Sequence, residues 1–148
     1  MPVLTQTQGT KTLGLTLGTL GSGAYLASST IDLTVAIPLE LSIEAEAIPN
    51  GVPTGNLQLV VFVETSLDGT NFTGPATRAT ANDGQETFVG SLPMAATTAV
   101  RNAKAFSTAG LPVTRYFRFV AKNDMGVPLA TFNKKHYACI PGIQVDAP

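Results

Sequence analysis

Hydrophobic and polar residues alternate with a period of two along most of this chain. Residues 57–64 have aliphatic side chains on one face of such a strand, and the other face also carries hydrophobic ones. A strand of this kind is buried on both sides, so we predict a central strand here. Asp68-Gly69 tolerates the positive φ of a tight turn. The sequence therefore predicts a hairpin whose return strand begins at Asn71-Phe72.

Residues 39–47 show the strictest alternation in the sequence. Leu, Ile and Ala residues form one face, and the other face carries Glu40, Glu44 and Glu46. Glu and Ala also favour helix, but a period of two over nine residues outweighs that propensity. We predict a strand whose acidic face is solvated or turned toward a basic partner.

Further alternating runs predict strands at residues 13–17, 31–35, 85–92, 95–107, 113–122 and 132–140. The first is rich in glycine, which suits an edge strand. Residues 95–107 can also be interpreted as a short helix, and we favour strand. Residues 113–122 carry aromatic side chains on both faces and predict a second central strand. After residue 140, Pro141-Gly142 is expected to release a C-terminal tail.

About eight strands and no strong helical pattern predict an all-β fold, an antiparallel two-sheet β-sandwich of jelly-roll or immunoglobulin-like topology. The 148 residues suit one domain, which we place at residues 11–148. Residues 1–10 have no clear periodicity and no charged side chain. They predict a flexible, extended N-terminal arm that a partner orders, with Val3, Leu4 and Thr5 as candidate contacts.

Charged residues make up only 13% of the chain, about half the usual share. A surface with so little charge suggests burial in an assembly, although the hydroxyl groups of a Thr-rich β-protein can also keep it soluble. Residues 1–100 contain two basic and eight acidic residues, whereas residues 101–148 contain seven basic and two acidic ones. Cross-strand ion pairing is the favoured consequence, and separate charged faces are the alternative. The basic residues form no dense patch, so we expect no nucleic-acid binding.

Residues with catalytic or metal-binding chemistry are few. His136 and Cys139 are the only histidine and the only cysteine, which excludes the usual zinc sets within one chain. The Asp68–Asn71 loop lacks the alternating acidic residues of a calcium loop, and a plain turn is favoured. We expect no enzymatic activity, no metal and no cofactor. The N-terminus has no signal-peptide pattern and no apolar run suits a membrane span, so we expect a protein made in the cytoplasm.

Three stretches have an order and spacing found in a known family: LGTLGSGAYLASSTIDL (17–33), LVVFVETSLDGTNFT (59–73) and RYFRFVAKNDMGVPLA (115–130). They resemble segments of small virion proteins of tailed bacteriophages, which are head and tail structural proteins. The resemblance implies a non-enzymatic part of the virion and identifies no individual site residue.

The first hypothesis is a capsid cement or decoration protein on the surface of the phage head. Its partners would be the major capsid protein or other virion proteins, together with further copies of itself, as a trimer if it occupies the threefold points of the shell. A tail or head-tail connector component is the alternative. A carbohydrate-binding module is a third hypothesis, although the chain has no Trp and only three Tyr residues for sugar stacking.

Overall fold

The computed structural model describes residues 5–8, 12–34, 40–74, 87–95, 102–108, 114–131, 137–140 and 142–146. Within these ranges all regular secondary structure is β-strand. The strands are β1 (Thr5–Gln8), β2 (Thr12–Thr16), β3 (Tyr25–Ala27), β4 (Ile31–Asp32), β5 (Glu40–Ala47), β6 (Gln58–Ser66), β7 (Thr87–Pro93), β8 (Asn102–Ser107), β9 (Tyr116–Asp124), β10 (Tyr137–Ile140) and β11 (Gly142–Asp146).

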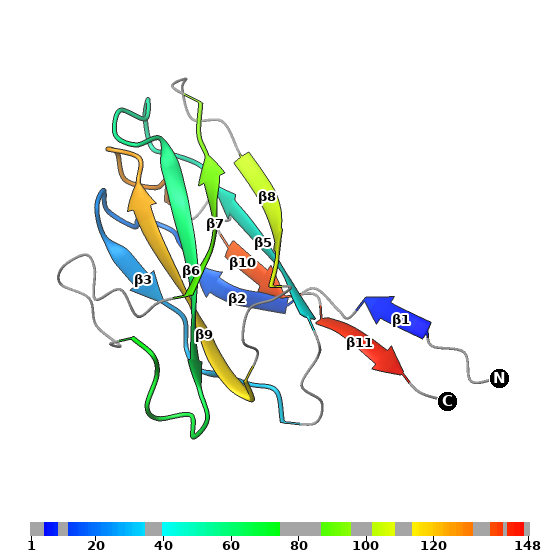
Figure 1. Ribbon diagram of the computed structural model, residues 1–148. Coiled ribbons are helices and arrows are strands. Elements are labelled where there is room, and N and C mark those ends of the chain that lie inside the picture. Colours follow the sequence, from blue (N-terminus) through cyan, green and yellow to red (C-terminus); the bar gives the residue numbers. More distant parts are fainter. Residues whose placement is uncertain are drawn as a thin grey trace.

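The strands form two antiparallel sheets (Figure 1). In the first sheet, β1 pairs with β11 and β2 pairs with β10, while β10 and β11 both pair with β5. The other edge of β5 pairs with β8. In the second sheet, β3 and β4 both pair with β9, and β6 and β7 follow. Each sheet therefore has four strand positions, several of which are divided into two segments.

The connectivity between the sheets is that of a jelly roll. When β1 with β2, β3 with β4, and β10 with β11 are each counted as one position, the sheet orders are 1-8-3-6 and 2-7-4-5. Only the connection from β6 to β7 stays within one sheet, and every other connection crosses to the opposite sheet. This is the double Greek key of the jelly-roll sandwich. The predicted antiparallel β-sandwich is confirmed, and of the two topologies proposed the chain adopts the jelly roll.

The core lies between the two sheets and contains the side chains that the period-two pattern assigned to it. On β5 the inward face consists of Leu41, Ile43, Ala45 and Ala47, each at most 2% exposed. The opposite sheet contributes aliphatic residues of β6 and two phenylalanines of β9, whose rings meet edge to face. The predicted central strands are confirmed, because β6 and β9 are the two inner strands of one sheet and neighbour each other.

The two sheets approach each other closely where β7 and β8 adjoin. A side chain at Gly90 of β7 would overlap the ring of Phe106 of β8. The Lys104 ammonium extends across the same gap, donates to the carbonyl of Ser91 at 3.2 Å and lies 5.1 Å from the Phe106 ring centre. Glycine at position 90 therefore sets the spacing of the sheets at this edge, where close packing excludes even a methyl group.

Two predictions were wrong, one of a return strand after β6 and one of a released C-terminal tail. Residues 67–74 form no return strand after β6, because the Asp68 carboxylate accepts the N–H groups of Thr70 and Asn71 that a ladder would need. The strands that pair with β6 are instead β7 and β9. Residues 142–146 are not a released tail but β11, which pairs with β1 and with the beginning of β5. The last part of the chain is thus divided into the two strands β10 and β11.

The predicted N-terminal arm has a partner within its own chain. Thr5 to Gln8 form an antiparallel ladder with residues 143–146. Figure 1 shows β1 and β11 side by side at the right, beyond the rest of the sandwich. We call this pair of strands the terminal ribbon. Val3 and Leu4 lie outside the described residues.

Candidate interaction site

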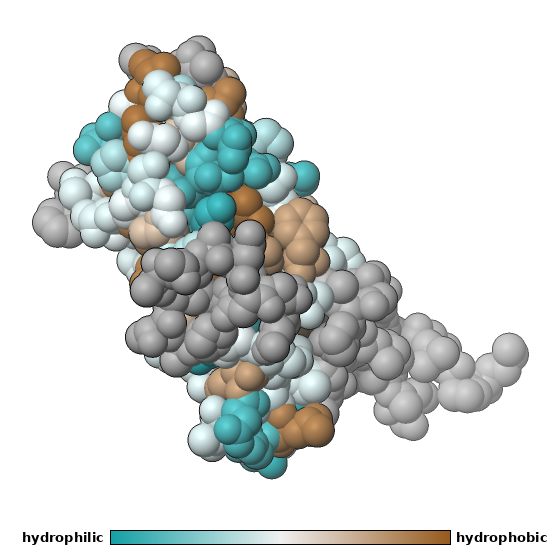
Figure 2. Space-filling view, turned by 60° about the vertical axis from the view of Figure 1, so that its left-hand side comes forward, coloured by the Kyte–Doolittle hydropathy of each residue, from teal (hydrophilic) through white to brown (hydrophobic). Residues whose placement is uncertain are grey.

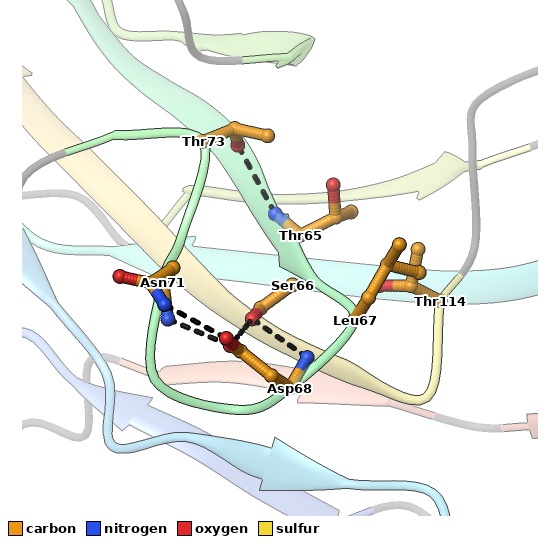
Figure 3. Close-up of a pocket in the computed structure, with 7 residues that line it drawn as sticks. All are labelled: Thr65, Ser66, Leu67, Asp68, Asn71, Thr73 and Thr114. Carbon is orange, nitrogen blue, oxygen red and sulfur yellow. Dashed lines mark hydrogen bonds between the residues drawn. The ribbon is translucent and has the colours of Figure 1, made fainter.

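The loop that follows β6 is held in one shape by the Asp68 side chain (Figure 3). One carboxylate oxygen accepts the backbone N–H groups of Thr70 and Asn71, both at 2.8 Å, and the hydroxyl of Ser66 at 2.9 Å. The other oxygen accepts the side-chain amide of Asn71 at 2.7 Å. The Ser66 hydroxyl also accepts the N–H of Gly69 at 3.0 Å. The predicted turn is therefore a network centred on one carboxylate.

These hydrogen bonds determine the charge state of Asp68. The backbone N–H of Asn71 is the largest cause, followed by that of Thr70, and together with the side-chain donors they lower the pKa of Asp68 well below its usual range. Gly69 has φ of 75° and lies against the Tyr116 ring, which favours glycine at this position. The carboxylate oxygens thus accept four hydrogen bonds from within the loop, which is the pattern of an Asx-type turn.

A buried ion pair fixes the other end of the same loop to the sheet. The Arg118 Nε donates to the Glu64 carboxylate at 2.5 Å, and both side chains are buried. Another guanidinium nitrogen donates to the carbonyl of Gly74 at 2.6 Å. The Phe72 ring lies 4.3 Å from the guanidinium carbon. Residues 72–74 are thereby attached to the outer face of β6 and β9.

A hollow of about 340 Å³ opens beside this loop, lined by Thr65, Ser66, Leu67, Asp68, Asn71, Thr73 and Thr114. Three of its hydroxyl groups already have partners. Ser66 bonds within the loop, Thr73 accepts the N–H of Thr65, and Thr114 donates to the carbonyl of Tyr116. The hollow therefore presents mainly methyl groups to an incoming group.

Leu67 stands at the rim of this hollow and is 86% exposed. Large hydrophobic side chains with this degree of exposure are rare on the described surface, where the next values are 61% for Leu13 and 56% for Phe88. Figure 2 shows a hydrophobic group beside hydrophilic ones at the lower end of the molecule, where Figure 1 places the loop after β6. We call Leu67 and the hollow together the loop site.

The acidic face predicted for residues 40–47 is only partly solvated. Glu46 is 5% exposed and Glu44 is half-buried, and both have interaction partners. Their cross-strand neighbours on β8 are Ala103 and Ala105. Glu40 pairs with Ile143 of the terminal ribbon. Of the two predicted alternatives, a solvated face and a face turned toward a basic partner, solvation does not hold at Glu46.

The structure brings the predicted contact residues Thr5 and Glu40 to the same part of the first sheet. Thr5 belongs to β1 and Glu40 to β5, and the intervening strand β11 pairs with both. Glu44 and Glu46 lie further along β5, opposite β10. The sequence analysis missed Leu67 and Arg118. The sequence did contain a signal for the exposure of Leu67. This leucine lies between Ser66 and Asp68 in a predicted turn, where no strand face could bury it.

The remaining chemical candidates are His136 and Cys139. His136 lies outside the described residues, and Cys139 belongs to β10, where it pairs with Leu13 and Glu44. Among the described residues, no cluster of His, Cys, Asp and Glu could hold a metal ion. The part of the chain that the structure describes also contains no helix long and apolar enough to cross a membrane.

Neither a protein-family model nor a curated protein matches this chain. The fold and the terminal ribbon are therefore the structural features that bear on function.

Proposed function

We propose that this protein is a non-enzymatic structural protein of a virion, a cement or decoration protein on the surface of a capsid. Three properties support the proposal. The fold is a jelly roll, an architecture that recurs in viral capsid domains as well as in lectins and cupins, so this support is an analogy. The chain has few charges, and the sequence resembles phage virion proteins in three stretches.

The terminal ribbon carries the proposal. In the sheet order of the described strands β1 is the outermost strand, and its pairing partner is β11. The four residues of β1 are Thr, Gln, Thr and Gln. Natural proteins protect exposed edges with lysine, proline, bulges or a covering segment, and β1 contains neither lysine nor proline. No described strand pairs with the outer edge of β1, and such an edge suits pairing with a strand of another protein.

In the proposed mechanism β1 extends the ribbon onto the edge of a neighbouring shell subunit. Backbone N–H and C=O groups make the contact, so the partner strand needs no particular side-chain sequence. Each backbone hydrogen bond contributes about 0.5–1.5 kcal/mol. Four residues therefore supply a modest affinity for each contact. The major capsid protein is the partner in this proposal.

The test is to delete residues 2–10 and measure binding to particles stripped of the protein. We expect binding to fall at least tenfold. Because β1 pairs only with β11 among the described strands, the melting temperature should fall by less than about 4 °C, the shift that roughly 1 kcal/mol produces in a chain of this size.

A second variant, which combines Gln6→Lys with Gln8→Lys, keeps the residues of the terminal ribbon but adds two positive charges to β1. It should also bind weakly, because lysine opposes edge pairing. Undiminished binding by the deletion variant would remove the ribbon from the mechanism. A large loss of melting temperature would show that β1 belongs to the folding core.

A further inference from the structure

Asn50 and Gly51 form the one Asn-Gly pair of the sequence, and they lie in the connection between β5 and β6. Asn50 is exposed, and Gly51 has φ of 138°, a conformation that residues with a side chain rarely adopt. The space around Gly51 is open, because the nearest atom to a side chain built there would be a methyl carbon of Val127 at 3.9 Å. The pair therefore combines an accessible side-chain amide with an unhindered backbone N–H group.

Hydrogen bonds fix this loop on both sides of the reactive groups. The Asn50 N–H donates to the carbonyl of Pro128, and the Thr54 N–H donates to the carbonyl of Met125, both at 2.8 Å. Within the part of the chain that the structure describes, neither the Asn50 side chain nor the Gly51 N–H has a hydrogen-bond partner. The two groups that a ring closure would join are therefore available for reaction.

We propose that Asn50 is a site of spontaneous deamidation. Solvent base removes the proton from the Gly51 nitrogen, and this nitrogen attacks the side-chain carbonyl carbon of Asn50. The bond from this carbon to the amide nitrogen breaks, the nitrogen leaves as ammonia with a proton from solvent, and a succinimide ring remains. Water then opens the ring at either carbonyl group, which gives aspartate or isoaspartate. No enzyme is needed, because the reacting groups belong to neighbouring residues.

The other asparagines with described side chains are protected against this reaction. Their amide groups donate hydrogen bonds of 2.7–2.9 Å, from Asn56 to Asp124, from Asn71 to Asp68, and from Asn123 to two backbone carbonyls. None of the three is followed by glycine. Asn50 should therefore react first.

Asp68-Gly69 shows how folding can protect a similar pair. An Asp-Gly pair can close the same ring, with loss of water. In the folded protein the Asp68 carboxylate accepts four hydrogen bonds, which lower its pKa well below the usual range and keep it ionised. A carboxylate that is ionised and held in this way resists attack by the Gly69 nitrogen. Folding should therefore protect Asp68 and leave Asn50 reactive.

The reaction changes the loop without removing its anchors. Residues 48–57 contain no charged side chain, so either product places a negative charge in an uncharged segment. Isoaspartate also lengthens the backbone by one carbon, between the anchor at the Asn50 N–H and the anchor at Thr54. The ladders of β5 and β6 lie outside this interval. Modified protein should therefore melt within a few degrees of unmodified protein.

Peptide mapping of the full-length protein by mass spectrometry tests the proposal. Folded protein and protein unfolded in urea are kept in neutral buffer, and samples taken over time are digested at acidic pH to prevent further reaction. In the folded protein Asn50 should convert about tenfold faster, or more, than any other described asparagine, which is a barrier difference of about 1.4 kcal/mol. Both aspartate and isoaspartate should appear at position 50. Asp68 should isomerise only in urea.

The matched control is Asn50→Gln, which keeps the amide but has a longer side chain and would need a larger ring. It should stay unmodified at this position. Three results would overturn the proposal. They are an Asn50 that stays intact in the folded protein while it reacts in urea, a product that contains aspartate without isoaspartate, and conversion of the Asn50→Gln variant at the wild-type rate. The outcome is independent of the proposed function, because the reaction needs neither a particle nor a partner.

Discussion

Replacing Arg118 with methionine tests the account of the loop and its attachment to the sheet. Methionine keeps much of the length of the side chain but removes the guanidinium. The Glu64 carboxylate, whose side chain is 0% exposed, loses this cation, and the carbonyl of Gly74 loses its donor. Removing one partner of a buried ion pair lowers the free energy of unfolding by about 3–5 kcal/mol, because the charge of the other partner stays buried without its counter-charge.

For a chain of this size, about 1 kcal/mol corresponds to a shift of roughly 2–4 °C in melting temperature. Arg118→Met should therefore lower the melting temperature by roughly 6–20 °C. The matched control is Arg115→Met, which breaks an ion pair with Asp32 whose side chains are 50% and 34% exposed. Exposed pairs contribute about 0–1 kcal/mol, so the control should melt within a few degrees of the wild type.

The double variant Glu64→Leu with Arg118→Met distinguishes a broken pair from a general packing defect. A buried ion pair can often be exchanged for hydrophobic side chains at little cost. The double variant should therefore regain most of the stability, with a coupling energy of about 2 kcal/mol or more in urea unfolding. The argument fails if Arg118→Met and Arg115→Met cost the same, or if the double variant is as unstable as the two single variants added together.

Three further predictions concern the loop, the sheet spacing and metal. Because hydrogen bonds lower the pKa of Asp68 in the folded protein, its contribution to stability is present above the usual Asp pKa of about 3.9 and is lost as the pH falls below it; Asp68→Asn should reduce this acid dependence in melts recorded from pH 6 to pH 2, and an unchanged profile would refute the assignment. Gly90→Ala should cost about 1–3 kcal/mol in chemical unfolding, since the new methyl group displaces the Phe106 ring; a neutral result would show that the sheets can separate freely. A chelator should leave both the β-type circular dichroism spectrum and the melting temperature unchanged, and melting on chelation would reveal a structural metal.

The period-two pattern was sufficient to predict the sandwich because burial acts on whole strand faces. The inward residues of β5 and the inner positions of β6 and β9 follow directly from alternation. The same pattern could not predict the topology, because a jelly roll and an immunoglobulin-like sandwich bury alternating strand faces equally well. Only the pairing of the C-terminal strands with β5 and with the N-terminal strands distinguishes the jelly roll.

The candidate site was harder to predict because long-range contacts create it. Asp68-Gly69 correctly indicated a turn, but the sequence does not show that the Asp68 carboxylate binds the next N–H groups and so prevents a return strand. The period-two pattern places Arg118 on a face that would be expected to be solvated. Its burial depends on Glu64, which lies 54 positions earlier in the chain. The pairing of β1 with β11 joins the two ends of the chain, and no local pattern could indicate it.

Electron cryo-microscopy of purified particles that carry the protein tests the central claim most directly. The account predicts density for the jelly-roll sandwich on the outer surface of the capsid shell, with the β1 edge paired to a strand of a neighbouring subunit. Density for the sandwich in a tail or connector, or on the shell with the terminal ribbon pointing into solvent, would contradict it.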